Sequence, residues 1–398
     1  MQQNNMQSMQ KRRPMQIIGN YQLSVINYLL TLHVGMKQRQ TYTDIEGARV
    51  EYISFASKGL LAETHAILQA TDIGATFEQQ YHALKQALEV LKTRLGGATV
   101  VMRRLFVSDA TNQMPLIDDA DSTTSIIQQP PLDGSKVAMW AYLHQGKSNY
   151  THLWDMTQIV PEGNSQHQAT QLLERYEQQL EAQGATLADN CIRTWFFVRD
   201  VDTQYHGLVV GRRENFTKQG LTPQTHYLAS TGIHGIPANT KAIIQMDTYA
   251  IPGIERRQQT YLYAPTHLNP TYQYGVTFER GVKIDFGDRS HIYISGTASI
   301  NNRGKVEHTG DILKQTRRMW ENVETLLAEG GAGWNDVMQI IVYLRDTADY
   351  TLVSRLFAEK FPDTPYVITY APVCRPTWLI EMECMAIIPH TDSTLKPY

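Results

Sequence analysis

The sequence predicts an α+β protein in which three β-α-β-α-β units form an internal pseudotrimer. Three observations predict this fold. An amphipathic helix followed by a strand that ends in Asp occurs three times along the 398 residues, a strand-like stretch precedes each helix, and a further strand closes each unit. One unit alone leaves a sheet face uncovered, so three sheets are expected to pack around an axis with their helices outside.

The repeated helix and strand pairs share one pattern. Apolar residues at three- and four-residue spacing predict each helix, a nearby Gly ends it, and β-branched and aromatic residues predict the strand that follows. The pairs are 76–97 with 98–109, 168–186 with 191–200, and 311–333 with 337–346.

Further elements complete each unit. The opening strands are expected at 50–59, 151–160 and 291–300, and the closing strands at 136–145, 241–250 and 377–388. A second helix is expected at 207–220 and 350–361 in the second and third units. The first unit has the polar loop 110–134 in that place, so we expect it to lack this helix.

These elements divide the chain into four parts. We expect a disordered tail rich in Gln and Met over 1–15 and a divergent first unit over 16–147. The second unit is expected over 148–270 and the third over 271–398.

Composition excludes several classes of protein. The formal net charge of −3 gives no reason to expect nucleic-acid binding, and no apolar run approaches the roughly 20 residues that span a bilayer. The start of the chain lacks the apolar region of a secretory signal. The three cysteines form no CxxC pair, which is typical of a reducing compartment. We therefore expect a cytoplasmic protein that binds neither nucleic acid nor membrane.

The stretch APVCRPTWLIEMEC at 371–384 combines a strand pattern with two carboxylates. Glu381 and Glu383 lie two residues apart, so they share one face of a strand whose other residues are largely apolar. One interpretation is an exposed sheet face or a structural ion pair. The other is a general acid or base that lines a cleft.

The third unit resembles the RidA/YjgF family, whose subunits have a chorismate-mutase-like fold. The matching stretches are YISGTASINNRGKVEHTGDILKQTRRMWENVETLLAEGGAGWNDVMQIIVYLRD at 293–346 and FPDTPYVITYAPVCRPTWLIEMECMAI at 361–387. The family forms homotrimers with ligand clefts between subunits, so the resemblance implies an internal pseudotrimer of RidA-like units. Its enzymes hydrolyse enamines and imines, and they clamp the substrate carboxylate with an Arg. Tyr366 stands at that position here, and Arg375 is a candidate replacement.

A second resemblance, to the chorismatases, covers about residue 150 to the end. It is carried by the order of five motifs before the third unit: IRTWFFVRD, GRRENF, HYLASTGIHG, RRQQTYLYAP and YGVTFERG. Chorismatases place a Glu on the closing strand to protonate the enolpyruvyl methylene of chorismate, and some have a Cys seven residues earlier. The resemblance implies these roles for Glu381 and Cys374. An inert, buried thiol is the alternative for Cys374.

A cyclic acid with two carboxylates needs guanidinium groups and ring contacts. The candidates for substrate binding are Arg213 or its neighbour Arg212, Arg257, Arg280, Arg375, Thr231 and Tyr366. Surface charge, an ordinary turn and packing are the respective alternatives. Glu383 is expected to pair with an Arg across the sheet.

These residues favour a chorismatase-like enzyme that releases pyruvate, acting as a monomer or weak homo-oligomer on a small carboxylic acid. A RidA-type deaminase and a non-catalytic small-molecule-binding protein are the alternatives. No metal or organic cofactor is expected, because zinc spacing, a P-loop and a dinucleotide fingerprint are all absent from the sequence.

Overall fold

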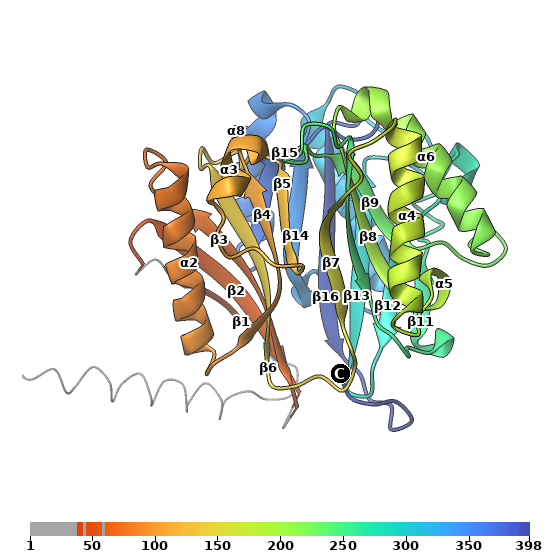
Figure 1. Cartoon of the computed structure of the whole chain (residues 1–398), viewed down its shortest axis with the longest axis horizontal. Coiled ribbons are helices and arrows are strands. Elements are labelled where there is room, and N and C mark those ends of the chain that lie inside the picture. The colour runs from red at the N-terminus through yellow and green to blue at the C-terminus, as the bar shows by residue number, and fades with distance from the viewer. Residues whose placement is uncertain (1–37, 43–44, 58–59) are drawn as a thin grey trace, which may run out of the picture.

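The computed structural model describes residues 38–42, 45–57 and 60–398. Their strands form three sheets, and α-helices cover the outer faces of the sheets, as α2 and α4 illustrate in Figure 1. The predicted α+β class is therefore confirmed. The expected tail over 1–15 and the start of the first unit lie outside the described residues. None of the helices in the described residues is long and apolar enough to cross a membrane.

The first sheet has six strands in the order β1-β2-β3-β6-β4-β5. These strands are β1 (Gln38–Tyr42), β2 (Ala48–Ala56), β3 (Ala62–Ala70), β4 (Thr99–Val107), β5 (Thr124–Gln128) and β6 (Val137–Gln145). Helix α2 (Phe77–Arg94) packs on β2, β3 and β6. It begins at a reciprocal capping box between Thr76 and Gln79, which satisfies two backbone N–H groups that the first turn leaves free.

The second sheet has four strands in the order β7-β10-β8-β9. They are β7 (Leu153–Ile159), β8 (Cys191–Val198), β9 (Ala229–His234) and β10 (Ile244–Ala250). The helices of this part are α4 (Ser165–Glu181), the short α5 (Leu187–Asn190) and α6 (Val201–Lys218). Helices α4 and α6 pack against each other beside the sheet (Figure 1).

The third sheet has six strands in the order β11-β12-β13-β16-β14-β15. They are β11 (Gln259–Leu262), β12 (Gly281–Asp285), β13 (Arg289–Ala298), β14 (Val337–Leu344), β15 (Tyr366–Tyr370) and β16 (Ile380–Pro389). Helix α7 (Ile312–Glu329) packs on β13 and β16, and α8 (Tyr350–Lys360) packs on α7.

One strand order recurs in all three sheets: β3-β6-β4-β5, β7-β10-β8-β9 and β13-β16-β14-β15. In each case the last two strands are parallel and the closing strand is antiparallel to both of its neighbours. This recurrence agrees with the repetition in the sequence. That the three parts are copies around a pseudo-threefold axis stays a prediction.

The first sheet corrects two predictions. The strand expected at 50–59 is β2, but the strand next to the closing strand β6 is β3, which was not predicted. Glu63 and His65 interrupt its apolar pattern, although both side chains are buried. The expected loop 110–134 contains β5 and a four-residue helix α3 (Ala110–Gln113), so the second helix is shortened rather than lacking.

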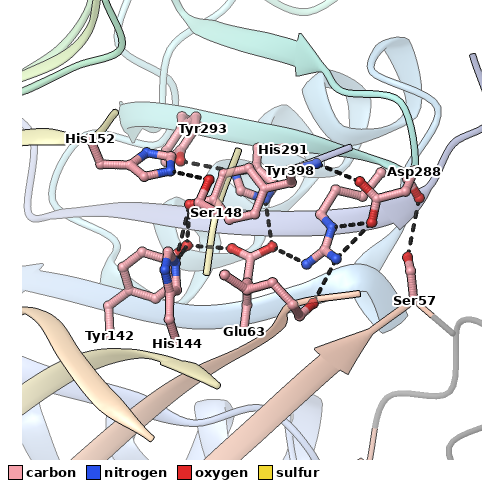
Figure 2. Close-up of polar contacts among 12 residues, drawn as sticks. Ser57, Glu63, Tyr142, His144, Ser148, His152, Asp288, His291, Tyr293 and Tyr398 are labelled. Atoms are coloured by element: carbon pink, nitrogen blue, oxygen red, sulfur yellow. Dashed lines mark hydrogen bonds and ion pairs between the residues drawn. The ribbon is translucent and has the colours of Figure 1, made fainter. Parts of the chain in front are cut away.

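A buried polar network joins the first and third sheets (Figure 2). The Glu63 carboxylate lies 2.6 Å from Nη1 of Arg289 and 2.9 Å from Nε2 of His291, and it accepts a hydrogen bond from Tyr142. The Tyr142 hydroxyl lies 2.7 Å from that of Tyr398. Burial raises the pKa of Glu63, but His291 and Arg289 outweigh burial and hold it well below its ordinary value. Glu63 is therefore a paired, structural carboxylate.

Candidate functional site

Glu381 lies on the closing strand β16, between β13 and β14. It is opposite Ala298 on β13 and Tyr343 on β14, and its side chain is 5% exposed. The register of β13 shifts between Ile294 and Thr297, at Gly296. A Cβ atom at Gly296 would lie 2.1 Å from Oε1 of Glu381. Glycine is therefore required beside this carboxyl.

Only the third closing strand carries an acid at this position. The three closing strands can be compared through their neighbouring strands. On those neighbours, Phe106, Phe197 and Tyr343 each lie three residues before the Asp that follows the strand, and each is paired with one residue of the closing strand. The paired residues are Ala138 on β6, Gln245 on β10 and Glu381 on β16. The recurring strand order therefore places one acidic side chain, not three.

Glu381 lines a pocket between the second and third sheets. The pocket has about 470 Å³ of empty space, including its open mouth. Its lining comes from α6 and β9, from the segment before β12, from β13, and from the loop before β16. The lining residues are Tyr205, Arg212, Ser230, Gly232, Tyr274, Val276, Phe278, Arg280, Gly296, Ala298, Ile300, Cys374, Arg375, Trp378 and Glu381. Aromatic and aliphatic walls thus surround three arginines and one carboxyl.

The pocket keeps Glu381 protonated near neutral pH. Burial, and then the neighbouring Glu383 carboxylate, raise the pKa of Glu381 to about 8, although Arg280 and Arg193 act in the opposite direction. Among the described residues no group donates a hydrogen bond to this carboxyl. Its proton is therefore available to a ligand in the pocket.

Arg212 reaches the pocket from α6. Its Nε donates to Thr277 at 3.2 Å and its Nη1 to Ser230 at 3.3 Å, whereas Nη2 is buried and has no hydrogen-bond partner in the described part of the chain. Burial lowers the pKa of Arg212, although its interaction with the neighbouring Tyr205 hydroxyl acts in the opposite direction. An unpaired, buried N–H group is costly unless a ligand accepts from it.

Close helix packing places Arg212. A Cβ atom at Gly207 would lie 2.1 Å from the Ser165 hydroxyl, and one at Gly211 would lie 2.7 Å from the Gln166 carbonyl. These two glycines let α6 approach the start of α4. The opposite side of α6 then presents Tyr205 and Arg212, seven residues and two turns apart, to the pocket.

Arg280 is the second buried guanidinium. Its Nη2 donates to the Asn269 carbonyl at 3.1 Å, and its Nε is buried without a partner among the described residues. The guanidinium lies 5.4 Å from the ring centres of Tyr274 and Phe278, both of which line the pocket. Two buried arginines in one pocket can hold two carboxylates of one ligand.

Arg375 and Cys374 lie on the loop before β16. Arg375 is exposed at the rim and lies 5.6 Å from the Tyr274 ring and 5.8 Å from the Trp378 ring. Burial, and then Glu381, raise the pKa of the Cys374 thiol to about 12, although its interaction with the Tyr205 hydroxyl lowers it. A thiolate is the nucleophilic form of Cys, so Cys374 is suited to packing or hydrogen bonding in this pocket.

Glu383 lies in a buried ion pair. Its carboxylate is 2.9 Å from Nη2 of Arg193, and it accepts from Nε1 of Trp195 at 2.8 Å and from the Thr231 hydroxyl at 2.5 Å. Arg104 lies 3.8 Å away. The sequence predicted an Arg partner across the sheet, whereas Arg193 lies on β8 of the second sheet.

Four predicted binding residues lie outside the pocket lining. Thr231 is buried and binds the carboxylate of Glu383, so the expected contact is internal. Arg213 is exposed on α6, because the helix turns its neighbour Arg212 inward. Arg257 is exposed and pairs with Glu255 at 2.6 Å. Tyr366 packs against Phe357 at the start of β15. The structure therefore does not bring these four residues together with Glu381 in one pocket.

Several pocket residues were not among those predicted from the sequence, including Ser230, Tyr274, Phe278 and Trp378. Helical periodicity would have favoured Arg212 over Arg213, since Arg212 shares a face with Tyr205. Tyr274 and Phe278 belong to the motif YGVTFERG, so the resemblance to the chorismatases marked their segment, although no regular apolar spacing marks the two residues themselves.

Comparison with known proteins places part of the chain in a family. The family model described as Endoribonuclease L-PSP matches residues 278–388. The 3-aminoacrylate deaminase RutC of Acinetobacter baylyi is 33% identical over 98 residues, which are 24% of this chain and 77% of RutC. A RutC family protein of Pyrococcus abyssi is 34% identical over 97 residues, which are 24% of this chain and 76% of that protein.

The fold is similar over a larger part of the chain to a crystal structure of a chorismatase. The similarity covers 72% of this chain and 93% of the chorismatase, with a TM-score of 0.57 and 19% sequence identity. At this identity the likeness concerns the fold. The family model and the identities to RutC and its relative show that the chain belongs to the RidA/YjgF superfamily.

Proposed function

We propose that the protein is a chorismatase-like enzyme that cleaves the enolpyruvyl group of chorismate, or of a related cyclic acid, and releases pyruvate. One observation carries the proposal: two buried guanidinium groups with unpartnered N–H groups line the same pocket as a carboxyl whose pKa is about 8. A cyclic dicarboxylic acid with an enol ether would accept hydrogen bonds from Arg212 and Arg280 and receive the proton of Glu381.

The reaction would proceed in three steps. Glu381 donates its proton to the terminal methylene carbon of the enolpyruvyl group, and an oxocarbenium ion forms at the ether carbon. The Glu381 carboxylate stabilises this cation and then takes a proton from the water that adds to it. Glu381, now protonated again, gives this proton to the ether oxygen as the bond between that oxygen and the hemiketal carbon breaks, and the hemiketal hydroxyl returns a proton to Glu381. The products are pyruvate and the ring acid with a hydroxyl group in place of the enol ether.

The buried arginines would orient the ring acid for this proton transfer. Arg212 is held by Thr277 and Ser230, and Arg280 by Asn269, so both guanidinium groups are fixed before a ligand arrives. Preorganised donors lower the cost of ordering the bound complex. The aromatic residues around them, Tyr274, Phe278 and Trp378, supply faces for the ring.

The identity to RutC favours a second candidate, a RidA-type deaminase of enamines or imines. The position of the family's clamp holds Tyr366, which is not among the residues that line the pocket. Arg212 or Arg280 would therefore have to hold the carboxylate of such a substrate. A third candidate is a small-molecule-binding protein without activity.

The test is incubation of the purified protein with chorismate, followed by assay of pyruvate. We expect pyruvate in proportion to enzyme and time. Ammonia from an amino-acid-derived imine, without pyruvate from chorismate, would instead support the deaminase. Neither product, together with measurable binding of chorismate, would support the binding protein.

The pH dependence of turnover provides a separate prediction. Glu381 has to be protonated to act as the acid, and its pKa is about 8. We therefore expect kcat/KM for chorismate to be level near pH 7 and to fall about tenfold per pH unit above about pH 8. Initial rates between pH 6 and pH 10 measure this. A rate that rises through this range would contradict an acid role for Glu381.

We also propose that the parts 16–147, 148–270 and 271–398 are RidA-like units related by a pseudo-threefold axis. The shared strand order supports this proposal. Superposition of the three four-strand cores tests it, since copies should overlay with the same rotation between successive units.

A further inference from the structure

A second pocket lies next to the first and shares Arg280 with it. It has about 400 Å³ of empty space, including its open mouth, and the residues that matter for its chemistry are Tyr227, Tyr263, Tyr272 and Glu279. None of these four residues lines the first pocket. The reaction proposed above makes no use of them.

Glu279 is a buried carboxylate without a cationic partner. It is 7% exposed, its Oε1 accepts from the backbone N–H of Tyr227 at 2.7 Å, and in the described part of the chain it forms no ion pair. Its own backbone N–H donates to the Leu228 carbonyl at 2.8 Å, which holds the residue beside β9. A carboxylate at such a site favours a bound cation, because burial without a partner is costly. Burial raises the pKa of Glu279 to about 7, although the hydrogen bond from the Tyr227 backbone and the charge of Arg280 lower it.

Two of the three tyrosines leave aromatic surface open to a ligand, whereas Tyr227 is buried and its ring stacks on Phe216. Tyr263 is 43% exposed and Tyr272 is 47% exposed, which is unusual for large side chains in this protein. In the described residues no Lys or Arg lies over the ring of Tyr227, Tyr263 or Tyr272, whereas Tyr261 nearby is covered by Arg256 at 4.8 Å. Open aromatic faces beside a carboxylate attract organic cations.

The backbone next to Tyr263 is strained. The next residue, Ala264, has a φ of 47°, which is in the left-handed region that residues other than Gly rarely adopt. The Glu329 carboxylate at the end of α7 accepts from the backbone N–H of Tyr263 at 2.9 Å and of Ala264 at 2.6 Å. Such strain persists where the surroundings impose it, and here it places an aromatic side chain on the pocket.

Arg280 does not supply the missing partner. Its Nη2 donates to the Asn269 carbonyl, and its guanidinium lies against Tyr274 and Phe278, both of which line the first pocket. The other titratable lining residue, His226, has a pKa lowered by burial and is therefore neutral near pH 7. The more distant charges that act on the tyrosines are Arg212, Arg213, Arg256 and Glu329.

We propose that the pocket of Tyr227, Tyr263, Tyr272 and Glu279 binds a small substituted ammonium ion, with the cation against the tyrosine rings and the Glu279 carboxylate. The four residues of this site do not line the pocket of Glu381, so the proposal does not depend on the chemistry proposed there. A ligand with an ammonium head and a short neutral tail fits its composition.

The test is a calorimetric titration of the full chain with choline at pH 8, beside its neutral isostere 3,3-dimethylbutan-1-ol. We expect choline to bind about tenfold or more tightly than the isostere, since only choline gains from the carboxylate and the ring faces. Glu279→Gln and Tyr263→Ala should each weaken choline binding about tenfold. Because an ionised carboxylate is needed, choline affinity should fall as the pH is lowered through about 7.

Two control variants make the result specific. Glu255→Gln removes an exposed carboxylate that pairs with Arg257, and Glu381→Gln changes the first pocket; both should leave choline affinity unchanged. Thermal unfolding of each variant verifies that it is folded. Equal affinity for choline and the isostere, an unchanged affinity in Glu279→Gln, or no binding at about 20 mM choline would each overturn the proposal.

Discussion

Glu381→Gln is expected to lower kcat for pyruvate release from chorismate by roughly 100- to 10,000-fold. Glutamine has nearly the same shape but carries no acidic proton, so the enol ether is not protonated and the cation that follows lacks a carboxylate. The two buried arginines are unchanged, and chorismate should bind with about the same affinity. Steady-state rates and a calorimetric titration of chorismate measure the two effects.

The fold of this variant should also survive. The Glu381 carboxyl accepts no hydrogen bond from the described residues, so its replacement breaks no internal contact of that kind. Loss of chorismate binding together with activity would show that Glu381 orders the pocket rather than donating a proton. Retained turnover would mean that another group supplies the proton.

Glu383→Gln is expected to reduce the free energy of unfolding by about 3–5 kcal/mol. The variant leaves the buried guanidinium of Arg193 without its carboxylate at 2.9 Å, and it weakens the contacts to Trp195 and Thr231. An uncompensated buried charge is costlier than the pair that it replaces. Urea unfolding of the variant and the parent protein measures the difference.

Measuring turnover of both variants distinguishes the role of Glu383 from that of Glu381. Glu383 does not line the pocket of Glu381, so most of the activity near pH 7 should remain in Glu383→Gln. The negative charge of Glu383 raises the pKa of Glu381, so its removal in Glu383→Gln should lower that pKa. The fall in kcat/KM at alkaline pH should therefore begin at a lower pH in this variant. The opposite pattern, in which Glu383→Gln abolishes turnover and Glu381→Gln lowers stability, would mean that Glu383 is the acid and Glu381 the structural carboxylate.

The sequence by itself determined the fold class and the position of the acid on its strand. Periodicity of 3.6 and of 2 residues is a local property, so the helix and strand pairs at 76–109, 168–200 and 311–346 are predicted from neighbouring residues alone. The same local pattern puts Glu381 and Glu383 on one face. It predicts β3 poorly, because Glu63 and His65 are buried only through partners that lie far away in the sequence.

The tertiary structure decided what each of these side chains does. Glu381 and Glu383 are residues of the same type on the same face of one strand. Glu381 nevertheless faces a pocket, whereas Glu383 contacts Arg193 of the second sheet. The choice between Arg212 and Arg213 likewise depends on how α6 packs on α4 through Gly207 and Gly211. Burial, the largest cause of the raised pKa of Glu381, depends on packing between the second and third sheets. The charge of Glu383, which also raises this pKa, is local to the strand, whereas Arg280 and Arg193, which lower it, reach Glu381 only through the tertiary structure.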